Sequence, residues 1–261
     1  MPFSTQDPRL YYVQEGSGPD LVLIHGVGSQ HGDWDGVVRA LNGRFSILRY
    51  DLRGHGASAA PEGPYEIEDF AADLIGLMDE VGFSRPHVAG FSLGGLIAQS
   101  LALTYPDRVN ALALLGTVAG RTPEERARVE GRLEFIANSH PADYFDQSVS
   151  RWFTEAFQAA HPEIIEARKA VVTAMDGAAY AAAYHALAMT DFADRLSEIS
   201  HRTLVATGED DIGSNPRMAQ LIADTIADSR LEILPGLRHS ILLEAPDRVA
   251  GLLSEFLAEA N

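Results

Sequence analysis

Short apolar runs alternate along the chain with helix-length amphipathic segments, a pattern typical of βαβ units and a mostly parallel sheet. The run from Leu21 to Ile24 is apolar throughout, as expected for a strand covered on both faces. Residues 67–81 instead place apolar side chains at helical spacing. The pattern predicts strands over residues 10–14, 21–24, 45–50, 87–90 and 109–115, and helices over 67–81 and 93–105. The fold class is therefore α/β.

The pattern changes after Leu115, because residues 117–200 are rich in Ala, Glu and Arg, are helical in period and contain no convincing strand. Helices are predicted over residues 123–137, 141–150, 154–160, 162–175 and 178–189. The alternation resumes with strands over 203–207 and 230–234 and helices over 216–226 and 246–257. We therefore predict a core of residues 1–116 and 201–261. A helical cap of residues 117–200 would lie over the carboxyl ends of the strands, where open α/β sheets bind ligands.

The composition limits which binding partners and which cellular compartment are expected for the protein. The 261 residues are 46% hydrophobic, which is enough for one large core, and the net charge of −17 argues against nucleic acid as a partner. A small anionic substrate is compatible with this net charge, since an arginine inside a pocket can make the local electrostatic potential positive. The chain has no cysteine, which excludes disulfides, thiolate metal sites and a cysteine nucleophile. With no signal-peptide pattern and no apolar run of about 18 residues, we expect a cytoplasmic protein without a membrane partner.

The strongest chemical signal is Gly90-Phe91-Ser92-Leu93-Gly94, a G-x-S-x-G motif at a predicted strand-to-helix junction. Glycines two before and two after the serine let the backbone turn sharply and lift the hydroxyl clear of the sheet. The helix that follows directs its free N–H groups and its positive dipole end toward a developing oxyanion. A flexible glycine loop is the alternative, but the strand before and the helix after favour a nucleophilic Ser92.

A serine alcohol needs a base, and the base needs an orienting acid. In this type of site both partners follow the serine in the chain. His239 lies in the loop 235–240, directly after the last predicted strand and before the last helix, and is the candidate base. The acid should follow the strand 203–207, where Glu209, Asp210 and Asp211 are adjacent carboxylates. We favour Asp211. Asp210 stays an alternative, because the spacing alone does not distinguish the two residues.

The tetrahedral intermediate of acyl transfer also needs donors for its oxyanion. Leu93 supplies one backbone N–H, as the residue after the nucleophile. The loop His25-Gly26-Val27-Gly28 follows the strand 21–24, and its glycines allow close approach to substrate. Val27 N–H is therefore the candidate second donor. For His25, a structural role in the loop competes with a contact to substrate.

With these residues in place, the chain resembles the α/β-hydrolase superfamily from Leu10 to Leu257. The stretch from Asp51 to Ser58 is similar to its D-x-R-G-x-G-x-S loop, a structural hallmark of the superfamily. The resemblance implies a mostly parallel central sheet of the α/β-hydrolase type, with a helical cap inserted after the sixth strand. In the superfamily the acid stands three residues after the glycine that ends the sixth major strand. Counted from Gly208, that position is Asp211.

Within the superfamily the chain is most similar to 3-oxoadipate enol-lactonases and carboxylesterase-type members, through Arg49-Tyr50-Asp51, residues 61–65 and 76–79, and Arg151-Trp152-Phe153-Thr154. The likeness implies hydrolysis of a carboxylic ester or lactone without a metal or other cofactor. Arg151 and Trp152 are candidate substrate contacts, although Arg151 could instead pair with Glu155 one turn on.

Two other functions compete with ester hydrolysis. They are hydrolysis of a C–C bond in a vinylogous diketone, and ligand binding without turnover on the same fold. The departures from enol-lactonases are His25, where those enzymes often have serine or asparagine, and Phe91, where leucine is common. The apolar cap helices are compatible with a cover over the pocket and equally with a contact in a homo-oligomer.

Overall fold

The computed structural model describes residues 3–259 and contains one seven-stranded sheet. Residues 1–2 and 260–261, which the predicted core includes at its two ends, lie outside the described residues. The strand order is β1-β3-β2-β4-β5-β6-β7, with β1 antiparallel to β3 and every other pair parallel. The strands are β1 (Tyr12–Gly16), β2 (Asp20–Ile24), β3 (Ser46–Tyr50), β4 (His87–Phe91), β5 (Leu112–Leu115), β6 (Thr203–Gly208) and β7 (Ser229–Leu234).

Helices cover both faces of the sheet, and each face has its own apolar cluster. In β2, Leu21 and Leu23 pack with α1 and α11 on one face, while Val22 and Ile24 pack with α2 and α3 on the other. This division follows from the two-residue period of a strand. The helices flanking the sheet are α1 (Asp35–Leu41), α2 (Ile67–Val81), α3 (Leu93–Thr104), α9 (Pro216–Thr225), α10 (Ile241–Glu244) and α11 (Pro246–Ala258), with 3₁₀ turns η1 (His31–Trp34), η2 (Pro106–Arg108) and η3 (Ala193–Glu198).

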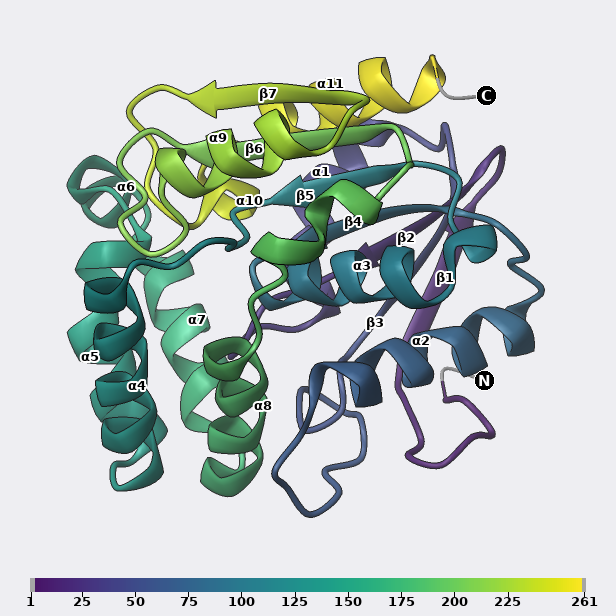
Figure 1. Cartoon of the computed structure of the whole chain (residues 1–261). Helices are drawn as coiled ribbons and strands as arrows, with labels where there is room; N and C mark the ends of the chain where they lie inside the picture. The colour runs from purple at the N-terminus through teal and green to yellow at the C-terminus, as the bar shows by residue number, and fades with distance from the viewer. Residues whose placement is uncertain (1–2, 260–261) are drawn as a thin grey trace.

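Five helices lie between β5 and β6 and gather at the side of the sheet toward which the parallel strands point (Figure 1). They are α4 (Pro123–Ala137), α5 (Pro141–Trp152), α6 (Glu155–Ala160), α7 (Pro162–Thr173) and α8 (Gly177–Met189). A separate apolar cluster, which includes Phe145, Val172 and Tyr180, packs α4, α5, α7 and α8 together. The division of the chain into a core and a cap stays a prediction, but these helices occupy the place predicted for the cap.

The expected position of the insertion after the sixth strand is wrong by one, because α4 follows β5, the fifth strand in chain order. The residues before β1 explain the difference. They make a single antiparallel bridge, between Phe3 and Tyr11, and no ladder long enough to count as a strand. Only five strands therefore precede the insertion within residues 3–259.

None of the helices within residues 3–259 is both long and apolar enough to cross a membrane. The same residues contain no cluster of three or more His, Cys, Asp or Glu side chains arranged to hold a metal ion.

Candidate active site

Ser92 stands between the last residue of β4 and the first residue of α3, in a sharp turn of the backbone. Its φ of 56° and ψ of −115° are costly for a residue with a Cβ, and such strain is found mainly at functional sites. The turn depends on its flanking glycines. A Cβ added to Gly90 would lie 2.1 Å from Gly94 O, and one added to Gly94 would lie 2.4 Å from Ile24 O. The motif therefore forms the strained strand-to-helix turn that the sequence predicts.

Asp211 and His239 are joined by a 2.6 Å contact between Asp211 Oδ2 and His239 Nδ1. The two residues come from the loops after β6 and β7, which are neighbouring parallel strands. Asp211 Oδ1 accepts the N–H groups of Gly213 and Ser214, at 2.8 and 2.9 Å. Asp210 is exposed, and its N–H donates to the backbone. Of the adjacent carboxylates, it is Asp211 that contacts His239.

The electrostatics of Asp211 favour its ionised form. Burial acts to raise the pKa of this carboxyl, but the neighbouring His239 and the hydrogen bonds from His239, Ser214 and Gly213 outweigh burial, so the pKa lies below its usual value. An ionised Asp211 accepts the Nδ1–H of His239 and leaves Nε2 free to take a proton.

Ser92, Asp211 and His239 line one cavity, which is also bordered by the helices inserted after β5. The His239 ring lies with its centroid 4.9 Å from that of Phe91, the residue before Ser92. Within residues 3–259, Ser92 Oγ makes no hydrogen bond to His239 Nε2. Such bonds commonly tighten only when substrate is bound. The three predicted side chains are therefore brought to a common site.

The loop after β2 lies directly against Ser92. A Cβ added to Gly26 would be 3.0 Å from Ser92 Cβ, so this loop approaches the serine as closely as a glycine permits. Val27 lines the cavity, and Leu93 begins α3. Neither of these two residues uses its N–H in a hydrogen bond to another group of the described chain. Two backbone donors are thus free near Ser92, as expected for an oxyanion hole.

His25 does not line the cavity, so of its two candidate roles the contact to substrate is wrong and the structural role holds. The side chain is fully buried, with Nδ1–H donating to Gly26 O at 2.8 Å and Nε2 accepting Leu52 N–H at 3.0 Å. His55 makes the reciprocal connection, since its Nε2 accepts Gly28 N–H and its Nδ1–H donates to Arg53 O. The two rings tie the loop after β2 to the loop after β3, so both histidines are structural.

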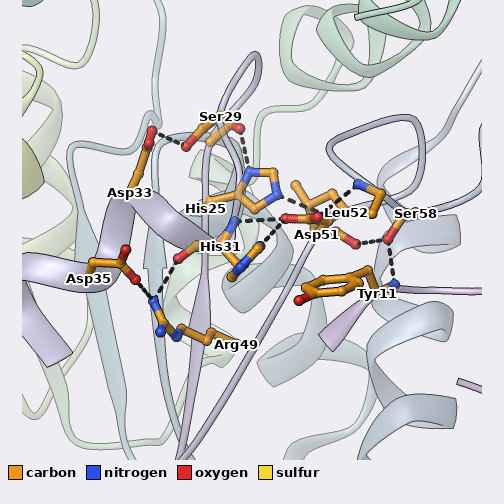
Figure 2. Close-up of polar contacts among 12 residues, drawn as sticks. Tyr11, His25, Ser29, His31, Asp33, Asp35, Arg49, Asp51, Leu52 and Ser58 are labelled. Atoms are coloured by element: carbon orange, nitrogen blue, oxygen red, sulfur yellow. Dashed lines mark hydrogen bonds and ion pairs between the residues drawn. The ribbon is translucent and has the colours of Figure 1, made fainter. Parts of the chain in front are cut away.

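The loop that resembles D-x-R-G-x-G-x-S is organised around Asp51, which lies among His25, His31 and Ser58 (Figure 2). Asp51 Oδ1 accepts the His31 N–H at 2.8 Å and contacts His31 Nδ1 at 2.7 Å. Ser58 Oγ donates to Asp51 O and accepts the Tyr11 N–H. None of these groups lines the cavity, which agrees with a structural role for the motif.

We expect the two buried histidines to make the protein sensitive to mild acid. Burial lowers the pKa of His25 to about 3 and that of His55 to about 4. Below the ordinary histidine pKa of about 6.5 the unfolded chain takes up protons that the folded chain does not, so the free energy of unfolding falls as pH falls from about 6.5 toward 4. Each histidine contributes a slope of up to about 1.4 kcal/mol per pH unit in this window.

Urea unfolding at pH 6.5 and pH 5 measures this effect. His55→Gln should reduce the pH slope, because glutamine can accept the Gly28 N–H without titrating. The control is His140→Gln, at an exposed histidine whose hydrogen bond from the Ala142 N–H glutamine can also accept, and it should change the slope much less. An unaltered slope in His55→Gln would contradict the assignment.

Among the predicted cap residues, Arg151 and Trp152 both line the cavity. Arg151 donates to Ser148 Oγ rather than pairing with Glu155. The end of α5 is also attached to the histidine loop, since Ser240 N–H donates to Trp152 O at 2.8 Å and Arg238 donates to the carbonyls of residues 150 and 153. Residues on both sides of His239 therefore hold the inserted helices over the site.

Several residues that line the cavity carry no sequence motif and were not predicted. They are four further arginines and three tyrosines from the inserted helices and the segment before them: Arg121, Arg128, Arg132, Arg168, Tyr144, Tyr180 and Tyr184. For Arg168 a signal existed, because it stands four residues before Val172 on the buried stripe of α7. A charged residue on an apolar stripe indicates a buried polar function.

The comparisons with known proteins agree with this geometry. A family model described as "alpha/beta hydrolase fold" matches residues 19–246. The chain is 30% identical to 3-oxoadipate enol-lactonase 2 of Acinetobacter baylyi, over 88% of this chain and 86% of that protein. Among solved structures it is similar to an enol-lactonase from Burkholderia xenovorans LB400, at 30% identity, a TM-score of 0.92, and 98% and 100% coverage. A hydrolase from Pseudomonas aeruginosa PA01 is similar at 31% identity, a TM-score of 0.91, and 98% and 97% coverage. The chain belongs to the α/β-hydrolase fold family and has the likeness to enol-lactonases that its motifs predict.

Proposed function

We propose that the protein is a serine hydrolase that cleaves a carboxylic ester or lactone through an acyl-enzyme on Ser92. The observation that carries the proposal is the 2.6 Å contact of buried Asp211 with His239, on the cavity that also holds the strained Ser92. A serine, a histidine with a free Nε2 and an ionised acid are the groups that nucleophilic acyl transfer requires.

In the proposed reaction, Ser92 Oγ forms a bond to the substrate carbonyl carbon while His239 Nε2 takes the serine proton. The N–H groups of Val27 and Leu93 hold the oxyanion of the tetrahedral intermediate. When the carbonyl reforms, the C–O bond of the ester breaks and His239 gives its proton to the leaving oxygen. Water then attacks the acyl-enzyme with His239 as base, and the acid and the free Ser92 hydroxyl are released. Asp211 keeps the imidazole in the required tautomer throughout.

For the substrate we propose a lactone, and an enol-lactone such as 3-oxoadipate enol-lactone in particular. Support comes from the relatives that bear this name at about 30% identity over nearly the whole chain. Val27, Arg151 and Trp152 are the proposed contacts beside the triad, because all three line the cavity.

A substrate panel on the wild-type protein tests the proposal. It should include p-nitrophenyl acetate, a γ-lactone, an enol-lactone and a vinylogous diketone, with product acids followed by pH-stat titration. We expect turnover of the esters and lactones, with the enol-lactone giving the highest kcat/KM. Consumption of the diketone alone would replace the proposal by C–C bond hydrolysis. No turnover, together with no labelling of Ser92 by a fluorophosphonate, would indicate a ligand-binding protein.

A further inference from the structure

The candidate active-site cavity is lined by more cationic side chains than the composition of the chain suggests. Five arginines and three carboxylates border it, in a protein with 37 acidic and only 20 basic residues. Two of the carboxylates have partners of their own, because Asp211 contacts His239 and Glu125 pairs with Arg217. The lining of the cavity is thus positively charged although the protein as a whole is strongly anionic, and this favours an anionic ligand.

Arg168 is a buried arginine of this cavity whose hydrogen-bonding capacity is only partly used. Its exposed fraction is only 9%, and its Nε makes an ion pair with Asp33 Oδ2 at 3.4 Å. Its Nη1 is fully buried and has no hydrogen-bond partner. A buried charged donor without an acceptor is costly, and such groups are normally satisfied by a ligand or by water. Arg168 therefore lines the cavity while keeping a buried donor that no protein group satisfies.

Arg168 is also held in place from the core side of the cavity. Asp33 belongs to η1, and its Oδ2 accepts the hydroxyl of Ser29 (Figure 2). Ser29 lies in the same loop as Gly26 and Val27, the residues beside Ser92. The loop that carries the proposed oxyanion donor therefore also fixes the ion-pair partner of Arg168, which links the position of the guanidinium to that of the reacting carbonyl.

A second arginine, Arg151, lines the same cavity as Arg168 and Tyr180. Tyr180 packs against the loop after β2, where a Cβ added to Gly28 would lie 2.7 Å from Tyr180 Cε2. Arg151 itself forms no ion pair within the described part of the chain.

We propose that Arg168, with Arg151 on the same cavity, binds a carboxylate of the substrate remote from the bond that is cleaved, so that Arg168 determines specificity for carboxylate-bearing esters or lactones. This inference rests on the proposed ester or lactone hydrolysis at Ser92. A carboxylate fits the planar fork of a guanidinium in a bidentate arrangement. A single negative charge also suits this site better than a phosphate dianion, because Asp33 and Asp211 border the same cavity.

Two esters of matched length measure the preference for a substrate that carries a carboxylate. Mono-p-nitrophenyl glutarate ends in a carboxylate, and p-nitrophenyl valerate ends in a methyl group at the same position. The readout is the ratio of kcat/KM for the charged ester to that for the neutral ester. In Arg168→Met this ratio should fall by about tenfold or more, as expected for loss of a hydrogen bond between charged groups. The control is Arg126→Met, which removes one positive charge from an exposed position of α4 outside the cavity and should leave the ratio unchanged.

Asp33→Asn separates anion binding from a structural role for the ion pair. Removing the competing carboxylate should raise the ratio by about threefold to tenfold, opposite in sign to Arg168→Met. If the pair were only structural, both variants would change the two substrates alike and the ratio would stay constant. If Arg168→Met fails to fold, the double variant Arg168→Met/Asp33→Asn leaves no unpaired buried charge and should show the same low ratio. A ratio that stays constant in all of these variants overturns the proposal.

Calorimetry with the Ser92→Ala protein keeps this test separate from the proposed hydrolysis. Monomethyl glutarate should bind more tightly than dimethyl glutarate, and the difference should disappear in Ser92→Ala/Arg168→Met. This result would stand even if the wild-type protein hydrolysed neither p-nitrophenyl ester, in which case only the proposed function would fail. Equal binding of the two glutarates, or binding of neither, overturns the carboxylate subsite.

Discussion

Ser92→Ala is expected to lower kcat for p-nitrophenyl acetate by at least about 10⁴-fold, because it removes the proposed nucleophile while leaving the rest of the site in place. The fold should persist, since alanine needs no more room than serine and the turn is set by Gly90 and Gly94. Alanine at a φ of 56° is strained to about the same degree as serine. Initial rates, with far-UV circular dichroism of both proteins, measure the two parts of this expectation.

The control for this variant is Ser240→Ala, which removes a different hydroxyl from the same cavity. It should keep kcat within about threefold of wild type, since its backbone N–H rather than its hydroxyl holds the end of α5. A fluorophosphonate should add one label per wild-type chain and none to Ser92→Ala. If activity survived in Ser92→Ala but not in Ser240→Ala, the nucleophile would be Ser240, and the mechanism proposed above would be wrong.

The elements that position the catalytic groups could be predicted from the sequence because each has a strong local signal. The predicted helix over residues 67–81 has the bounds of α2, where apolar spacing and a capping box at Glu66 agree. By contrast, the hydrophobic pattern does not predict α1. It has seven residues including Gly36, and only Val37 and Leu41 are buried, so its apolar stripe is too short to be recognised. Strand β1 begins two residues later than predicted, because its register is set by pairing with β3.

In the candidate site, too, some residues could be predicted from local signals and others could not. Ser92 and His239 carry local signals, a glycine-bracketed turn and a loop after the last strand, and the structure brings both to one cavity. The choice between Asp210 and Asp211 depends on which side chain turns inward to His239, a tertiary fact that spacing within three adjacent carboxylates does not contain. The two roles left open for His25 could not be separated for a related reason, since its hydrogen bond with the Leu52 N–H joins two loops that are distant in sequence. Four of the five arginines that line the cavity come from helices whose docking no local pattern specifies.

Asp211→Asn should lower kcat by roughly 10³- to 10⁴-fold, through the tautomer of His239. In the folded protein Asp211 Oδ1 accepts two backbone N–H groups, from Gly213 and Ser214, while Oδ2 faces His239 Nδ1. An asparagine would keep its carbonyl oxygen on the two N–H groups and turn its NH₂ toward Nδ1. The imidazole would then have to accept at Nδ1 and carry its proton on Nε2, so it could no longer take the proton of Ser92.

Asp210→Asn is the matched control, because it makes the same chemical change at the adjacent exposed carboxylate. Its kcat should stay within about threefold of wild type. The ¹⁵N chemical shifts of His239 report the tautomer directly, and in Asp211→Asn they should show a protonated Nε2 at pH 8. If Asp210→Asn lost activity and Asp211→Asn kept it, the acid would be the other carboxylate. If Asp211→Asn lost activity with an unchanged tautomer, Asp211 would act through its charge rather than through the orientation of the ring.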